Sequence, residues 1–136
     1  DAVAAQLRDA GIKVKRTILP GSTFWNDWAK YPFSSTNWNH RPFAVQVWGL
    51  AYRSGEAWNE MGWSNAEFDA LLAEANAIAD ADKRRVVAGK CQALIAEEGC
   101  TMQPYWRSLY RSHSSNTVCD MHNAYHAHVY KWGFKA

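Results

Sequence analysis

The residues best suited to chemistry form one short run, Trp38-Asn39-His40-Arg41-Pro42. Trp38 offers a flat stacking surface, and Arg41 with His40 adds positive character beside it. If Pro42 is the first residue of a helix, unpaired backbone N–H groups and the positive end of the helix dipole point to the same place. Trp38, Asn39, His40 and Arg41 are therefore candidate ligand-binding residues for an anionic group next to an aromatic or peptide plane. The alternative is a solvated Arg41 and a Trp38 that is buried in the core.

A second candidate is the histidine-rich segment near the end of the chain. His122, His126 and His128 have spacings that suit a shared transition metal, either on a helix or on a strand. One segment cannot be helix and strand at once, and no carboxylate follows at a suitable spacing. We therefore predict an aromatic, polar tail that packs on the body, with no metal site and no cofactor.

The three cysteines allow at most one internal bridge. Cys100 and Cys119 bracket a predicted strand, and a disulfide between them contributes about 3 kcal/mol in the chain-entropy description. Such a bridge implies an oxidising compartment. Cys91 lies on the apolar face of a predicted helix and is expected to be an inert buried thiol. The alternative is that all three thiols are reduced and buried.

Composition and missing motifs narrow the function classes. The 136 residues are 48% hydrophobic and 21% charged, which is typical of a soluble globular domain. The net charge of +2 is too small to indicate nucleic-acid binding, and no apolar run is long enough to insert into a membrane. No nucleophile elbow or phosphate-binding glycine loop occurs, so we do not expect an enzyme.

The first half of the chain predicts alternating helices and strands. Residues 1–10 form a helical pattern that Gly11 ends, with Ile12 placed to fold back on Leu7. Residues 12–19 alternate like a half-buried strand, and a short helix follows, capped by Ser22 or Thr23. Residues 33–38 are a second strand candidate, and a helix is expected from Pro42 onward.

The second half predicts a pair of helices and a third strand. Ser64 and Glu67 form a capping box, and Trp63 with Phe68 forms a hydrophobic staple. A second helix is capped by Asp80 or Asp82 and stops at Gly99. Its inward side chains are expected to be Val86, Val87, Cys91, Leu94 and Ile95. Glu97 and Glu98 fall where the helix dipole disfavours them, and residues 105–110 are the third strand candidate.

Several stretches in this order resemble the C-terminal lobe of the extracytoplasmic solute-binding proteins, family 5, of peptide-type ABC importers. They are Leu7 to Val14, Trp38 with Pro42, Ala51 to Gly55, Asn59 to Leu72, Asp80 to Arg85, and Ala96 to Gly99 with Met102-Gln103-Pro104. Each stretch is short, but the ordered set spans nearly the whole chain.

The resemblance implies an α/β fold, in which residues 1–136 are part of the C-terminal lobe of a type II periplasmic-binding-protein fold with a mixed sheet flanked by helices. It implies a periplasmic protein that captures a peptide or another small solute between two lobes and delivers it to permease subunits. Because the chain starts at Asp1 instead of Met, we expect a processed chain or a fragment without its N-terminal lobe. An extracytoplasmic location fits a Cys100–Cys119 bridge.

In this resemblance Trp38 matches a tryptophan of the interlobe cleft. Peptide-binding members often have an acidic residue shortly after it, whereas this chain has Asn39, His40 and Arg41. Arg41 suits a carboxylate or phosphate. Two alternatives stay open, a carbohydrate-binding module that uses surface tryptophans and a histidine-rich metal-binding protein.

Overall fold

A computed structural model describes residues 1–119 and 128–135. The helices are α1 (Ala2–Asp9), α2 (Gly21–Asp27), α3 (Ala44–Ala51), α4 (Ala66–Ala77) and α5 (Ala81–Glu98), with short 3-10 helices η1 (Trp28–Lys30) and η2 (Val129–Lys131). The strands β1 (Thr117–Val118) and β2 (Gly133–Phe134) pair antiparallel, with Thr117 opposite Phe134.

The expected α/β fold, a lobe of a type II periplasmic-binding-protein fold with a mixed sheet flanked by helices, is wrong for the part of the chain that the structure describes. Its only sheet is the β1–β2 pair, and residues 12–19, 33–38 and 105–110 are not strands. Alternation of apolar and polar residues makes a segment suitable for a sheet, but a strand exists only where another strand pairs with it. None of these three segments has such a partner here.

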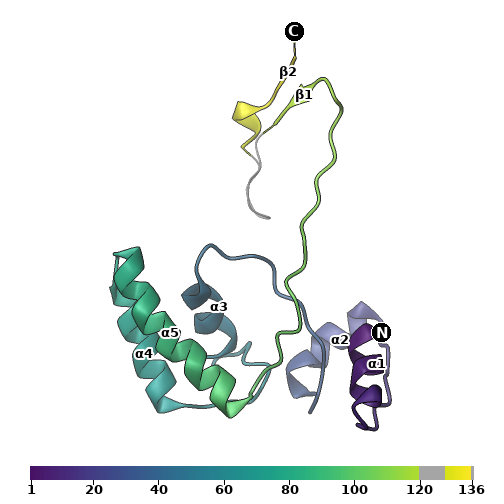
Figure 1. Cartoon of the computed structure of the whole chain (residues 1–136), viewed down its shortest axis with the longest axis vertical. Coiled ribbons are helices and arrows are strands. Elements are labelled where there is room, and N and C mark those ends of the chain that lie inside the picture. The colour runs from purple at the N-terminus through teal and green to yellow at the C-terminus, as the bar shows by residue number, and fades with distance from the viewer. Residues whose placement is uncertain (120–127, 136) are drawn as a thin grey trace.

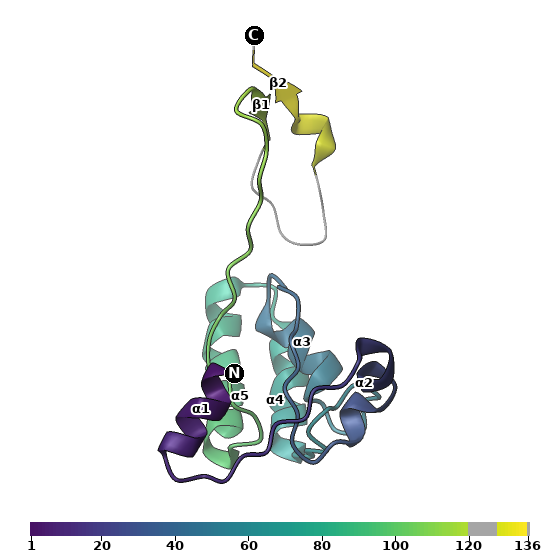
Figure 2. The same cartoon turned by 90° about the vertical axis from the view of Figure 1, so that its right-hand side faces the viewer.

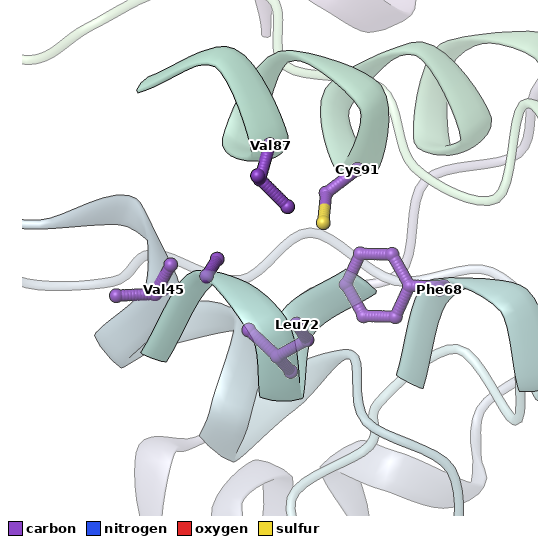
Figure 3. Close-up of a cluster of buried hydrophobic side chains, with 6 residues drawn as sticks. Val45, Phe68, Leu72, Val87 and Cys91 are labelled. Atoms are coloured by element: carbon purple, nitrogen blue, oxygen red, sulfur yellow. The ribbon is translucent and has the colours of Figure 1, made fainter. Parts of the chain in front are cut away.

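The core lies where α3, α4 and α5 pack together (Figure 1). Figure 3 shows Val87 and Cys91 of α5 directed toward Leu72 and Phe68 of α4, with Val45 of α3 at one side. Phe68 and Cys91 are fully buried. Because α4 and α5 are joined by a short connection, their apolar faces meet as an antiparallel pair.

Local signals place the helix ends correctly at three positions. Gly11 has a φ of +84°, and the N–H of Ile12 donates to the carbonyl of Leu7 at 2.9 Å, as expected for this type of helix end. Asp80 Oδ1 caps α5 by accepting from the N–H groups of residues 82 and 83 at 3.0 and 2.9 Å. Gly99 ends α5 with a φ of +61°.

Two expected N-cap residues and one expected core residue are wrong. The N-cap of α4 is Asn65, whose side chain accepts from the N–H of Phe68 at 2.9 Å, while the hydroxyl of Ser64 donates to Ser54. Pro20 is the N-cap of α2, so Ser22 and Thr23 lie inside that helix. The expectation that Val86 points inward is also wrong, because 68% of it is exposed.

The C-terminal arm, defined as described residues 100–119 and 128–135, extends away from the helices. In Figures 1 and 2 the segment after α5 runs outward, and the β1–β2 pair lies at its far end with the C-terminus. Residues 1–99, the helical body, hold all five α-helices. The arm therefore contributes no side chain to the core between α3, α4 and α5.

Candidate functional site

Trp38 is half-buried, and Glu60 holds its indole ring. The indole Nε1–H donates to Glu60 Oε1 at 3.0 Å, and the hydroxyl of Thr36 donates to Glu60 Oε2 at 2.6 Å. One carboxylate thus accepts from two side chains that lie more than twenty positions earlier in the chain. A hydrogen bond to an ionised acceptor is stronger than a neutral one, so this contact restricts how Trp38 is oriented.

Four tryptophans follow one another across this part of the body. We call Trp25, Trp28, Trp38 and Trp58 the aromatic row, and the centroids of consecutive rings lie 5.8, 6.1 and 6.0 Å apart. The planes of consecutive rings are tilted by 63°, 58° and 55°. These geometries are typical of packed aromatic side chains. Because the rings are tilted against one another, the aromatic row does not present a single flat face.

The loop between α3 and α4 places Trp58 and Glu60 against Trp38. Asn59 stabilises this loop, because its side-chain amide donates to the carbonyls of Arg53 and Trp63 at 3.1 and 2.7 Å. The N–H of Ser54 donates to Asp69 Oδ1 of α4 at 3.1 Å, which fixes the other side of the loop. Glu60 is therefore carried by a loop with several internal hydrogen bonds.

The other three candidate residues lie next to Trp38 but are not drawn into one cluster. Asn39 and His40 are exposed, and Arg41 is half-buried with Nη1 3.5 Å from the carbonyl oxygen of His40. Pro42 is not the first helical residue, because α3 starts at Ala44 and Phe43 is its N-cap. The helix α3 thus starts two residues later in the chain than expected. The N–H of Phe43, its N-cap, already donates to Gln46 Oε1 at 3.4 Å.

Two cavities occur elsewhere in the described structure. One of about 430 Å³ is lined by Arg8, Gly11, Ile12, Lys13, Val14 and Lys15 at the end of α1. The other, of about 200 Å³, lies in the arm and is lined by Arg111, Ser112, His113, Thr117, Cys119 and Trp132. Trp38, Asn39, His40 and Arg41 line neither of these two cavities.

The cysteines are free thiols in the structure. Burial raises the pKa of Cys91, and burial likewise raises the pKa of Cys100, so both are poor nucleophiles near neutral pH. The Cys100–Cys119 bridge stays a prediction.

Of the three histidines proposed as metal ligands, only His128 lies within the described residues. His122 and His126 lie outside them, and among residues 1–119 and 128–135 no group of three His, Cys, Asp or Glu side chains is placed to hold a metal ion. Within the same ranges, no helix combines the length and the apolar character that are needed to span a membrane.

Sequence reasoning identified Trp38 but missed Glu60, Thr36 and the neighbouring tryptophans. A half-buried indole N–H needs an acceptor, so the presence of some partner could be anticipated from the residue type. Which residue supplies it depends on a contact between positions 38 and 60, and no sequence spacing encodes that contact.

Comparisons with protein-family models, curated proteins and solved structures find no match for this chain.

Proposed function

We propose that this chain is part of an extracytoplasmic solute-binding component of an ABC importer, which captures a peptide or other small solute and delivers it to permease subunits. The observation that carries the proposal is the fixed Trp38, held by Glu60 at 3.0 Å beside an exposed Asn39 and His40. An oriented aromatic ring with polar neighbours is a common element of small-molecule sites. The ordered resemblance to the solute-binding proteins supports the same assignment.

The exposure of residues beside Trp38 fits a protein that closes on its ligand. Small-molecule sites usually bury most of the ligand surface, whereas Trp38 is only half-buried and Asn39, His40 and Trp58 beside it are exposed. Capture with useful affinity therefore requires a second surface that covers this patch. In the proposal that surface belongs to another lobe, and closure shifts the population toward the covered state when solute binds.

The positive charge of Arg41 favours a solute that carries a negative group. It is next to the candidate patch in sequence and carries a permanent positive charge, so a carboxylate or phosphate on the solute is favoured. A solute with an aromatic or peptide plane and a negative group satisfies both Trp38 and Arg41. No step in this function involves bond making or breaking.

The test is to purify the whole protein, including the proposed second lobe, gently from its native compartment and to identify co-purifying molecules by mass spectrometry. The proposal predicts one organic solute at a stoichiometric level, with a negative group, and less of it in an Arg41→Ala variant. Lys30→Ala is the matched control, because Lys30 is exposed and its ammonium group pairs with Asp27 Oδ1 at 2.7 Å. Recovery of no organic solute, or of a metal ion alone, contradicts the proposal.

A further inference from the structure

Within the proposed solute site, on which this inference rests, the role of Glu60 is still unassigned. Its two oxygens accept hydrogen bonds from different donors, Trp38 at 3.0 Å and Thr36 at 2.6 Å. Both contacts are partly buried. A carboxylate with both oxygens engaged in this way keeps its negative charge but is held in one orientation by its two donors.

We propose that Glu60 is a positioning residue for Trp38: its hydrogen bonds fix the indole ring on which the solute stacks, and Glu60 does not itself bind the solute. The preference for a solute with a negative group then belongs to Arg41, as in the proposed function, and not to Glu60. A carboxylate next to an aromatic ring would otherwise favour an ammonium ion.

The geometry supports positioning over a purely structural contact. Trp38 is flanked by Trp28 and Trp58 at centroid distances of 6.1 and 6.0 Å, so rotation of its ring changes both contacts. Glu60 reaches the indole N–H from a separate loop, and it is the acceptor that fixes the ring among these neighbours. Orientation of Trp38 is therefore the property that depends on Glu60.

The first measurement follows the indole N–H signals of the ¹⁵N-labelled chain by NMR. The chain has eight tryptophans, and Trp38→Phe identifies the Trp38 signal among them. In Glu60→Ala this signal should move, and its hydrogen exchange should speed up about tenfold, because a bond to a charged acceptor is lost. Glu60→Gln should retain the signal, since its amide oxygen can accept from Trp38 while its NH₂ donates to Thr36.

Glu56→Gln is the matched control for the charge. It removes a carboxylate from the same loop, where Glu56 accepts from Arg53 Nε at 2.7 Å and is not bonded to a tryptophan. The Trp38 signal should be unchanged in this variant. An unchanged Trp38 signal in Glu60→Ala overturns the positioning role.

The second measurement uses three probes that share one aromatic ring: N-acetylphenylalanine, its neutral amide, and the cationic phenylalanine amide. The protein should prefer the anionic probe. Glu60→Gln should strengthen binding of that probe about threefold and leave the neutral probe unchanged, because only a nearby negative charge is removed. A merely structural role would change all three affinities by one factor.

Each outcome decides one part of the proposal. If Glu60→Ala does not fold, Trp38→Phe supplies the test, because it releases Glu60 Oε1 and should reduce the discrimination against phenylalanine amide. Preference of the original protein for the cationic probe overturns the charge assignment. If no probe binds while the Trp38 signal still depends on Glu60, the solute-binding function fails and the positioning role of Glu60 stands.

Discussion

At the scale of single residues, two carboxylates organise tryptophans of the body. Glu60 accepts from the indole of Trp38, and Glu98 accepts from the indole of Trp63 and from the side-chain amide of Asn65, the latter at 2.5 Å. The position of Glu98 at the end of α5 is unfavourable for the helix dipole. Its contacts with the start of α4 explain why an acidic residue is placed there.

Replacing Glu98 tests this explanation. Glu98→Ala should lower the free energy of unfolding by about 1 kcal/mol, because Trp63 and Asn65 lose their acceptor. Glu97→Ala is the matched control at the same helix end, and it should be neutral or slightly stabilising because an unfavourable charge is removed. Urea denaturation of both variants measures the difference. Equal effects of the two substitutions would contradict the role given to Glu98.

Tyr52 predicts a loss of stability in alkaline solution. Burial raises the pKa of Tyr52 above its usual value of 10, although a hydrogen bond with Thr101 partly opposes this shift. The unfolded chain therefore releases the phenolic proton at lower pH than the folded chain, and stability falls as the pH rises through this range. Thermal unfolding at pH 8 and pH 11 should show a smaller decrease for Tyr52→Phe than for the original protein. An identical decrease would rule out a contribution from Tyr52.

At the scale of elements, the α4–α5 pair holds most of the buried apolar side chains of the described structure. Phe68, Leu72, Val87 and Cys91 are buried between these helices, and Asp80 caps the start of α5. The cap satisfies two backbone N–H groups that the helix itself leaves without partners. The stability of the helix pair should therefore depend on this one side chain.

Substitution of Asp80 measures the contribution of the cap. Asp80→Ala should cost about 1 kcal/mol of unfolding free energy, whereas Asp80→Asn keeps a side-chain acceptor and should cost about 0.5 kcal/mol or less. Chemical denaturation followed by circular dichroism distinguishes the two variants. If Asp80→Asn is as unstable as Asp80→Ala, the hydrogen bonds of the cap are not what stabilises α5.

Three helix ends could be predicted from the sequence because their causes are local, whereas the starts of α2, α3 and α4 differ from the expected positions by one or more residues. Gly11, Asp80 and Gly99 act within one helical turn, and each ends or begins a helix as expected. The three strand predictions failed because a strand needs a partner that is remote in the sequence. The site shows the same division: Trp38 could be predicted from its residue type, whereas its bond to Glu60 joins positions that are 22 residues apart.

At the scale of the whole molecule, the arm and the body differ in burial and in charge. Ten large apolar side chains of the arm are exposed, including Trp106 at 88% and Tyr110 at 89%. The described residues of the arm carry Arg107, Arg111, Lys131 and Lys135 and no carboxylate. Exposed apolar surface of this extent is unusual for a monomer in solution and favours association.

Self-association should follow from the exposed arm. Sedimentation velocity should show reversible oligomers that dissociate on dilution and that increase with added salt, because salt screens the repulsion between the positive arms. The double variant Trp106→Ser, Tyr110→Ser should shift the protein toward monomer. The matched control Trp25→Ser removes a half-exposed tryptophan of the body and should leave the association unchanged. A monomer at all concentrations would contradict this expectation.

Binding of a solute at the patch around Trp38 is tested most directly by a titration of the ¹⁵N-labelled protein with N-acetylphenylalanine. We predict saturable shifts of the indole signals of Trp38 and Trp58, with a Kd of about 1 mM because the open patch contacts only one side of the solute. The signals of Trp106 and Trp132 in the arm should stay unchanged. Shifts confined to the arm tryptophans, or no saturable shift of Trp38, would contradict the assignment of this patch as the solute site.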